Sequence, residues 1–104
     1  MKKRKEIGKD RPIVPLLDSL GKRWSLRIIW ELQAGPTKFR ALRKACDGVS
    51  PSVLNKRLAE LRELDFVKKS DGGYTLTSDG ASLAEQLRKL DRWAHRREKQ
   101  SKDK

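Results

Sequence analysis

One side of the segment from Ser50 to Asp65 carries side chains that are well suited to bind nucleic acid. At helical spacing, four residues share this side: Ser52, Asn55, Lys56 and Ala59. They form a surface of small, hydrogen-bonding and cationic groups. A helix needs such a surface to enter a DNA major groove. The spacing therefore predicts a recognition helix.

The opposite side of the same segment predicts how this helix is anchored. Three leucines recur at helical spacing and form an apolar face: Leu54, Leu58 and Leu61. Ser50 is expected to cap the helix, because its hydroxyl can accept a hydrogen bond from a free backbone N–H. Pro51 suits the first helical position, where its missing N–H is not needed. We therefore expect one buried face and one exposed face.

A shorter helix and a hairpin are expected on either side of the recognition helix. A helical pattern opens with Arg40, Leu42 and Ala45, and it stops at Asp47-Gly48. Two strands, 66–69 and 74–76, are predicted around a turn at Asp71-Gly72-Gly73. The order of these elements predicts a mainly α fold with a small β-hairpin, a winged helix-turn-helix.

Basic and polar side chains of this motif are candidates for DNA contact. The candidates are Arg40, Arg43, Lys44, Ser50, Ser52, Asn55, Lys56, Arg57, Lys68 and Lys69. Arg43 and Lys44 lie where the motif usually crosses the DNA backbone. Arg57 borders the apolar stripe, so a structural or phosphate-facing role fits better than base reading. The alternatives are that Ser50 only caps the helix and that Asn55 and Lys56 are ordinary solvated residues.

Apolar helices are expected before and after the motif. The first spans residues 12–20 and ends at Gly21, and the second spans 24–34. The second helix is apolar around so much of its circumference that it must be covered from more than one direction, by the core and by a possible second subunit. After the hairpin, Thr77 can cap a long final helix with Asp79 in its first turn.

The final helix carries an apolar stripe that is too narrow and too distant to be needed wholly for one small core. Dimerisation is the favoured explanation, and packing on the same protomer is the alternative. We expect N- and C-terminal dimerisation helices in a symmetric homodimer. The expected interface residues are Val14, Leu17, Leu83, Leu87, Leu90 and Trp93.

The charge of the chain favours a polyanionic partner. The 104 residues suffice for one domain, with a net charge of +12 and a pI near 10.3. Residues 1–11 carry net +4 and residues 88–104 net +5, so much of the charge can attract phosphates without specifying a base. We expect a basic tail at 1–11, the domain at 12–98 and a second basic tail at 99–104. Basic ends that merely aid solubility are the alternative.

Other function classes find little support in the sequence. The single cysteine, Cys46, excludes an internal disulfide, and a packing role is favoured over redox sensing. The single histidine, His95, has no expected partner for catalysis or metal binding, so no enzyme activity and no cofactor are expected. Because no apolar run matches a membrane span or a secretory signal, we expect a cytoplasmic, nucleoid-associated protein with no membrane contact.

Several short runs, in the same order, resemble the HxlR-type winged helix-turn-helix transcriptional regulators, which are related to the MarR group. The matching runs are 20–32 (LGKRWSLRIIWEL), Gly35-Pro36 with Phe39, 49–61 (VSPSVLNKRLAEL), and Leu76-Thr77 with Gly80. The resemblance covers residues 13–94. It implies a dimeric DNA-binding regulator whose recognition helix reads the major groove and whose terminal helices pair.

The chain departs from the pattern of that family at three places. It has no cysteine near the N-terminus, which some members use as a redox or electrophile sensor. Its short wing lacks the arginine- and proline-bearing insertion of many relatives, so reading of the minor groove is not expected. Arg40 stands where a small polar residue usually caps the first motif helix, which favours phosphate contact over capping.

Two functions remain open on the sequence. The first is a sequence-specific dimeric transcriptional regulator that binds double-stranded DNA. The second is an architectural, chromatin-like DNA-binding protein with low sequence specificity, which the high charge and the short wing keep open. A winged helix used for protein contact is a weaker third reading, because a fold does not fix a function.

Overall fold

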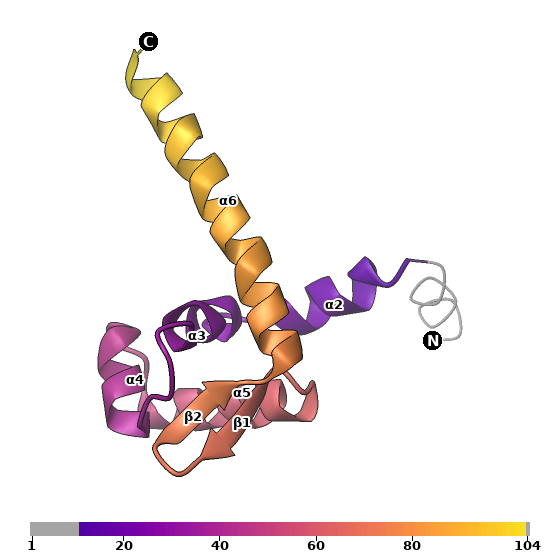
Figure 1. Cartoon of the computed structure of the whole chain (residues 1–104), viewed down its shortest axis with the longest axis vertical. Helices are drawn as coiled ribbons and strands as arrows, with labels where there is room; N and C mark the ends of the chain where they lie inside the picture. The colour runs from indigo at the N-terminus through magenta and orange to yellow at the C-terminus, as the bar shows by residue number, and fades with distance from the viewer. Residues whose placement is uncertain (1–10, 104) are drawn as a thin grey trace.

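The computed structural model describes the chain from Arg11 to Asp103, with side chains as far as Ser101. Six segments follow the first helix, α2 (Ile13–Leu20), in this order: α3 (Ser25–Leu32), α4 (Phe39–Ala45), α5 (Pro51–Glu63), β1 (Val67–Ser70), β2 (Gly73–Leu76) and α6 (Ser78–Asp103) (Figure 1). The predicted fold class, mainly helical with one small antiparallel hairpin in a winged helix-turn-helix order, is confirmed. The predicted basic tail at 1–11 lies, apart from Arg11, outside the described residues.

Every described helix and strand contributes apolar side chains to the core. Helix α2 contributes through Leu16 and Leu20. Its fully buried members include Ile28, Ile29, Leu32, Leu42, Leu54, Leu58, Leu61 and Val67. The three leucines predicted on one face of α5 are among them. Removal of these side chains from water is the main force that holds the elements together. The core therefore fixes α5 with its polar side outward.

Helix α3 runs through the middle of the domain but is not covered on all sides. It is shorter than the predicted span 24–34 at both ends. Trp24 adopts a left-handed conformation with φ 81°, so α3 begins after it, and Gln33 already forms the C-cap. Leu26 stays 37% exposed and Trp30 only half-buried. We expected other elements to pack on α3 from more than one direction. Within the described residues, they leave its side at Leu26 and Trp30 partly exposed.

The turn between α4 and α5 follows the local rules expected from its residues. Asp47 and Gly48 both have positive φ, 49° and 92°, and they end α4. The backbone N–H of Val53 donates to Ser50 Oγ at 3.2 Å, so Ser50 caps α5, and Pro51 occupies its first turn. The predicted end of α4, the Ser50 cap and the place of Pro51 are all confirmed.

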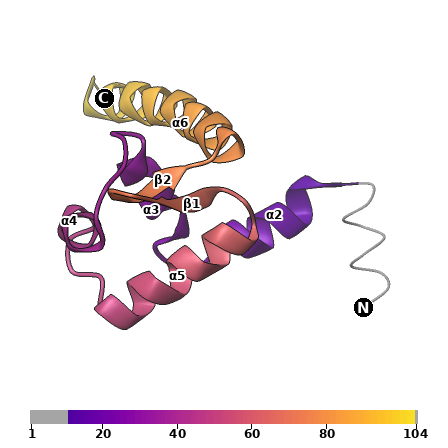
Figure 2. The ribbon, with the colours of Figure 1, turned by 60° about the horizontal axis from the view of Figure 1, so that its bottom comes forward.

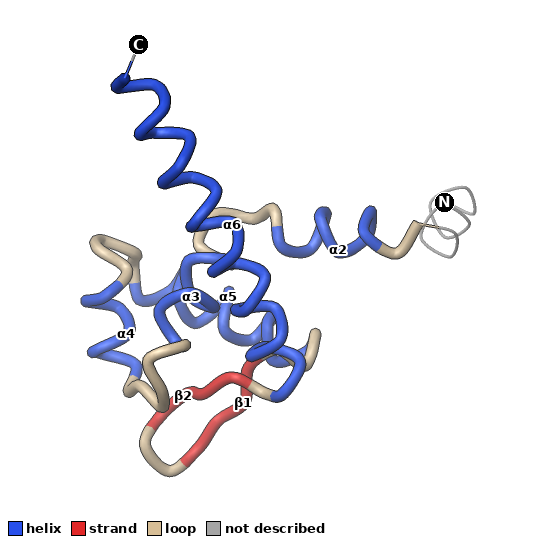
Figure 3. Tube along the Cα trace, turned by 45° about the horizontal axis from the view of Figure 1, so that its top comes forward, coloured by secondary structure: helices blue, strands red, loops and turns tan. Residues whose placement is uncertain are grey.

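The hairpin is tied to the loop that precedes α4. Strands β1 and β2 pair antiparallel, with Val67 opposite Leu76 and Ser70 opposite Gly73. Gly73 was expected in the turn, but it pairs as a strand residue, and only Asp71 and Gly72 remain between the strands. Figure 3 shows this turn pointing away from the helices.

Backbone contacts explain why a glycine is required where β2 begins. The backbone groups of Thr37 and Tyr74 exchange hydrogen bonds of 2.9 and 2.8 Å, which brings Thr37 against the start of β2. A Cβ on Gly73 would collide with the Thr37 backbone, and the φ of Gly73 is 128°. The start of β2 is therefore fixed against the loop that precedes α4.

Helix α6 begins on the domain and then leaves it. Thr77 Oγ1 accepts from the backbone N–H of Gly80 at 3.0 Å, which confirms the predicted cap. Figure 1 shows the C-terminal part of α6 projecting beyond the other elements. Residues 99–103, expected as a tail, continue this helix as far as Asp103. None of the helices between residues 11 and 103 is long and apolar enough to cross a membrane.

The apolar stripe of α6 divides into two parts with different surroundings. Leu83 and Leu87 are partly buried and pack against the core of their own protomer, and their place in a dimer interface stays a prediction. Leu90 and Trp93 remain 55% and 51% exposed. Helix α3 is much shorter than α6, with eight residues that span only about 12 Å, so it cannot cover the whole length of α6.

Candidate nucleic-acid interface

Helix α5 presents its polar side to solvent along one edge of the molecule. In Figure 2, α5 runs along the lower edge, with α4 near its N-terminal end and α2 near its C-terminal end. The four residues predicted on this side are all exposed: Ser52, Asn55, Lys56 and Ala59. The two-sided character of the helix is confirmed. The described chain thus leaves this face open to a large partner.

Two hydroxyl groups lie together where α5 begins. Ser50 Oγ and Ser52 Oγ are 3.4 Å apart, and either of them can donate to the other. Both residues are exposed, and Ser50 already accepts the capping bond from Val53. Free N–H groups and the dipole make the start of a helix attractive to negative charge. This end of α5 therefore suits a phosphate.

Helix α4 adds a basic surface next to the start of α5. Arg40, Arg43 and Lys44 are exposed. Together with Asp47 and Gly48 they line a shallow depression. Three cations and one carboxylate around this depression give it a positive potential, which attracts a phosphate backbone.

Arg43 also has a structural role within this surface. Its Nε donates to the Val49 carbonyl at 3.0 Å, so Arg43 joins α4 to the loop that leads into α5. The expectation that Arg40 takes the place of the cap is wrong. Lys38 holds the cap position of α4, without a side-chain capping bond, and Arg40 lies inside the first turn.

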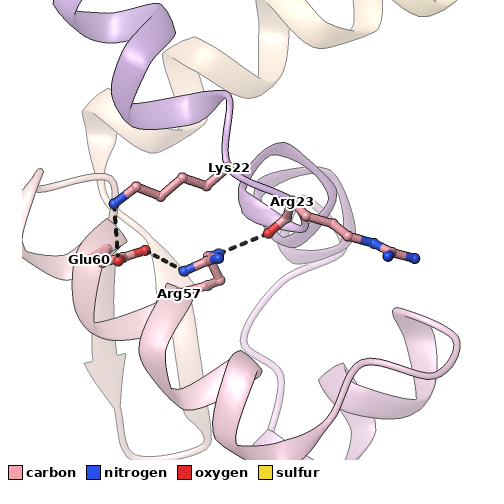
Figure 4. A network of polar contacts seen from close by, with 4 residues as sticks. All are labelled: Lys22, Arg23, Arg57 and Glu60. Atoms are coloured by element: carbon pink, nitrogen blue, oxygen red, sulfur yellow. Dashed lines mark hydrogen bonds and ion pairs between the residues drawn. The ribbon is translucent and has the colours of Figure 1, made fainter.

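Arg57 points away from the polar face of α5 and is held inside the protomer (Figure 4). Its Nε donates to the Arg23 carbonyl at 2.8 Å, and its Nη1 donates to Glu60 Oε1 at 3.0 Å. Its side chain is only 16% exposed. Of the roles that the sequence left open for Arg57, these contacts support the structural one.

Glu60 connects Arg57 to the loop between α2 and α3. Its Oε2 accepts from Lys22 Nζ at 3.2 Å, while its other oxygen accepts from Arg57. Burial raises the pKa of the Glu60 carboxyl, but the hydrogen bonds and charges of Lys22 and Arg57 outweigh burial and hold the pKa below its ordinary value. Sequence reasoning missed this contact, because Lys22 and Glu60 lie 38 positions apart.

The two lysines of the wing point to opposite sides of the hairpin. Lys68 and Lys69 are both exposed on β1, and successive residues of a strand face opposite ways. Lys69 lies opposite Tyr74, with its Nζ 6.0 Å from the centre of the Tyr74 ring. Because they face opposite sides of the hairpin, the two lysines cannot both contact the same stretch of a DNA backbone.

Cys46 and His95 lie in different surroundings, the first buried and the second exposed. Cys46 is fully buried in the core, where burial raises the pKa of its thiol and the charge of Arg27 lowers it by less. This supports the packing role. His95 is exposed on α6, where a hydrogen bond with the Asp91 carbonyl raises the pKa of its ring. The structure does not bring these two side chains together.

An exposed apolar groove lies between α3 and α6. It is lined by Leu26, Arg27, Trp30, Leu87, Leu90, Asp91 and Ala94. Leu26 and Trp30 were not among the predicted interface residues, although their i, i+4 spacing on an apolar helix was a usable signal. The groove continues the exposed apolar surface of Leu90 along the side of α3.

Comparisons with known proteins agree with this geometry. The family model described as HxlR-like helix-turn-helix matches residues 19–102. The HTH-type transcriptional regulator YvaP of Bacillus subtilis is 36% identical over 86 residues, which cover 75% of this chain and 79% of YvaP.

Two solved structures are also similar. The quinone-bound structure of YodB from Bacillus subtilis has a TM-score of 0.75 at 30% identity, covering 82% of this chain and 97% of YodB. A possible HxlR family transcriptional factor from Thermoplasma volcanium has a TM-score of 0.73 at 26% identity, covering 81% and 82%. Sequence, fold and the exposed basic motif therefore agree: the chain belongs to the HxlR-like helix-turn-helix family and is a DNA-binding transcriptional regulator.

Proposed function

We propose that the protein binds DNA as a symmetric homodimer, in which the α5 helix of each protomer lies in a major groove. The observation that carries this proposal is the two-sided α5 helix. Its leucines are buried, whereas its small, amide and lysine side chains are exposed along one edge of the domain. A helix presented in this way by a helix-turn-helix can reach base edges.

The exposed residues divide into groups by their position on the motif. Asn55 and Lys56 are placed to meet base edges, because they lie within the first turns of α5. Ser50 and Ser52 lie at its start and are suited to phosphate. The remaining contacts to the DNA backbone come from Arg40, Arg43, Lys44, Lys68 and Lys69. Arg57 is left out of this set because its guanidinium is engaged within the protomer.

Exposed apolar side chains on both terminal helices support the dimer. On α2, Leu17 is 61% exposed and Ile13 is 54% exposed, while Val14 is half-buried. On α6, Leu90 and Trp93 are more than half exposed next to the groove against α3. Apolar patches on two helices of so small a domain are typical of an interface. In this arrangement Leu83 serves the protomer core, and Leu87 lies at the edge of the groove.

A substitution experiment tests how the protein docks on DNA. Binding sites are first selected from random double-stranded DNA with the parent protein. Lys56→Ala and Asn55→Ala should weaken binding to the selected site by roughly tenfold, in line with about 1–3 kcal/mol for a side chain that contacts bases. The matched controls are Lys89→Ala and Gln86→Ala, which remove an exposed lysine and an exposed amide from α6.

The outcome separates the proposal from the architectural alternative, which the comparisons do not favour. A regulator should prefer its site over bulk DNA by roughly a thousandfold or more. Uniform binding to all sequences would instead indicate the architectural role. If the α5 variants bind like their controls, α5 does not dock in the groove as proposed.

A further inference from the structure

The loop between α2 and α3 is held by the recognition helix, and this contact links two parts of the proposed assembly. We infer that Lys22, the Arg23 carbonyl, Arg57 and Glu60 form a loop clamp that sets the direction of α2 relative to α5. The clamp would thereby determine which spacing of DNA half-sites the dimer accepts. This inference rests on the dimer proposed above.

Among the described residues, the apolar contacts of α2 with the core lie toward its C-terminal end. Leu20, at its C-terminal end, is its one buried residue, and Leu16 packs at the margin of the core. Ile13 and Leu17, nearer to its start, are mostly exposed. Figures 1 and 2 show α2 extending sideways from the domain. The short loop 21–24, which joins this end of α2 to α3, therefore helps to set its direction.

The backbone of this loop adopts a conformation that needs support. Trp24 has φ 81° and ψ −16°, in the left-handed region that is unfavourable for a residue with a large side chain. Such a conformation persists only where the surroundings hold it. The Arg23 guanidinium lies over the Trp24 ring, 5.1 Å from its centre, and supports the loop from one side.

The clamp supports the same backbone from the side of α5 (Figure 4). Arg57 Nε donates at 2.8 Å to the Arg23 carbonyl, which belongs to the peptide bond directly before Trp24. Glu60 uses one carboxylate oxygen for Arg57 and the other for Lys22. One turn of α5 thus holds both a backbone group and a side chain of the loop, through charge-assisted hydrogen bonds.

The consequence for DNA binding follows from what each helix touches. Helix α5 lies in the groove, and α2 contributes Ile13 and Leu17 to the contact between protomers. A rigid connection between α2 and α5, together with the contacts of α6, fixes the distance between the two recognition helices. Successive major grooves on one side of the duplex are about 34–36 Å apart, so small changes in the direction of α2 alter the match. A loosened clamp would let the dimer tolerate other spacings.

The experiment measures spacing preference separately from groove contact. The selected palindromic site is altered by inserting or deleting base pairs between its half-sites, and affinity is measured for each spacing and for an isolated half-site. The main variant is Glu60→Gln, and Glu63→Gln is its matched control, an exposed carboxylate on the same helix outside the clamp. Arg57→Met and the conservative Arg57→Lys complete the set.

The expected result is a change in spacing preference alone. Half-site affinity of Glu60→Gln should stay within about twofold of the parent, while the penalty for a wrong spacing falls by about tenfold. Glu63→Gln should lose as much affinity at a wrong half-site spacing as the parent does. Arg57→Met should lower the penalty at least as far as Glu60→Gln, and Arg57→Lys should fall between Arg57→Met and the parent, because lysine keeps the charge but not the two-sided geometry.

Three results would overturn the clamp or its premise. An unchanged spacing penalty in a folded Glu60→Gln protein refutes the clamp and leaves the dimer standing. A loss of half-site affinity in Arg57→Met but not in Glu60→Gln makes Arg57 a phosphate contact and also refutes it. A parent that binds the palindrome no better than a half-site refutes the proposed dimer itself. If Arg57→Met does not fold, Lys22→Met replaces it, since the Lys22 side chain is 49% exposed.

Discussion

Gly80, in the first turn of α6, packs directly against the carbonyl oxygen of Phe66, at a distance that leaves no room for a Cβ atom. The same oxygen accepts a hydrogen bond of 3.0 Å from the Thr77 backbone N–H. Through Thr77 and Gly80, the start of α6 is thus fixed to the segment that joins α5 to the wing. The position of α6 on the domain depends on this close backbone approach.

Gly80→Ala should therefore destabilise the protein by about 2–3 kcal/mol, because the new methyl group must push apart two backbone segments. The matched control is Gly72→Ala in the wing turn, where a Cβ would meet only ordinary contact with Pro36. The control should change stability by no more than about 0.5 kcal/mol. Denaturant unfolding of both variants measures the difference. Equal midpoints would show that α6 can shift without cost.

Glu60 should contribute to the loss of stability in acid. Its pKa in the folded protein lies below its ordinary value of 4.5. A carboxyl with a lowered folded pKa stabilises the protein fully above its unfolded pKa, and this contribution is lost as the pH falls through the folded value. Glu60→Gln should thus lose less stability than the parent as the pH falls below about 4.5. Urea unfolding at a series of pH values below and above 4.5, with Glu63→Gln as the control, measures how the free energy of unfolding changes with pH. Identical slopes for the parent and Glu60→Gln would contradict the ion pairs of the loop clamp.

Cys46 should not act as a redox sensor. Its side chain is fully buried and burial raises the pKa of its thiol, so little reactive thiolate is available to an oxidant. DNA binding by the parent and by Cys46→Ser should be equally insensitive to peroxide. Binding assays before and after treatment, with mass spectrometry of the thiol, provide the test. If oxidation abolishes binding by the parent but not by Cys46→Ser, Cys46 is a sensor after all.

Leu90 and Trp93 should hold the dimer together without serving the protomer core. Changing both to glutamate should give a folded monomer, because more than half of each side chain is already exposed. Affinity for the palindrome should fall by about a hundredfold or more, since the second half-site is no longer tethered to the first. Sedimentation and DNA titration measure the two effects, and Leu64→Glu is a control at a leucine outside α6, 39% exposed at the end of α5. A parent that sediments as a monomer at micromolar concentration would rule the interface out.

Features governed by neighbouring residues could be predicted from the sequence. The buried and exposed faces of α5 follow from spacings of three and four residues, and the Ser50 and Thr77 caps depend on partners within one turn. The start of α4 could not be predicted in this way. Lys38 begins this helix with an extended backbone and no side-chain capping bond, so its sequence carried no local signal and Arg40 was misplaced.

The role of Arg57 shows where such reasoning ends. Its position beside the apolar stripe of α5 left a structural and a phosphate-facing role open. The choice depends on the Arg23 carbonyl, 34 residues earlier in the chain, and on the left-handed Trp24 that follows it. No pattern of neighbours indicates that these groups meet, because folding alone brings them together.

The sequence by itself determined the helices and the hairpin, the two-sided recognition helix and the excess of positive charge, since periodicity, capping and composition act over short distances along the chain. Only the tertiary structure decided which leucines of the apolar stripe on α6 are buried and which are exposed. Leu83 and Leu87 are partly buried against the core, whereas Leu90 and Trp93 stay more than half exposed, Leu90 in the open groove beside α3. Burial depends on which segments pack together, and that is a property of the folded chain as a whole.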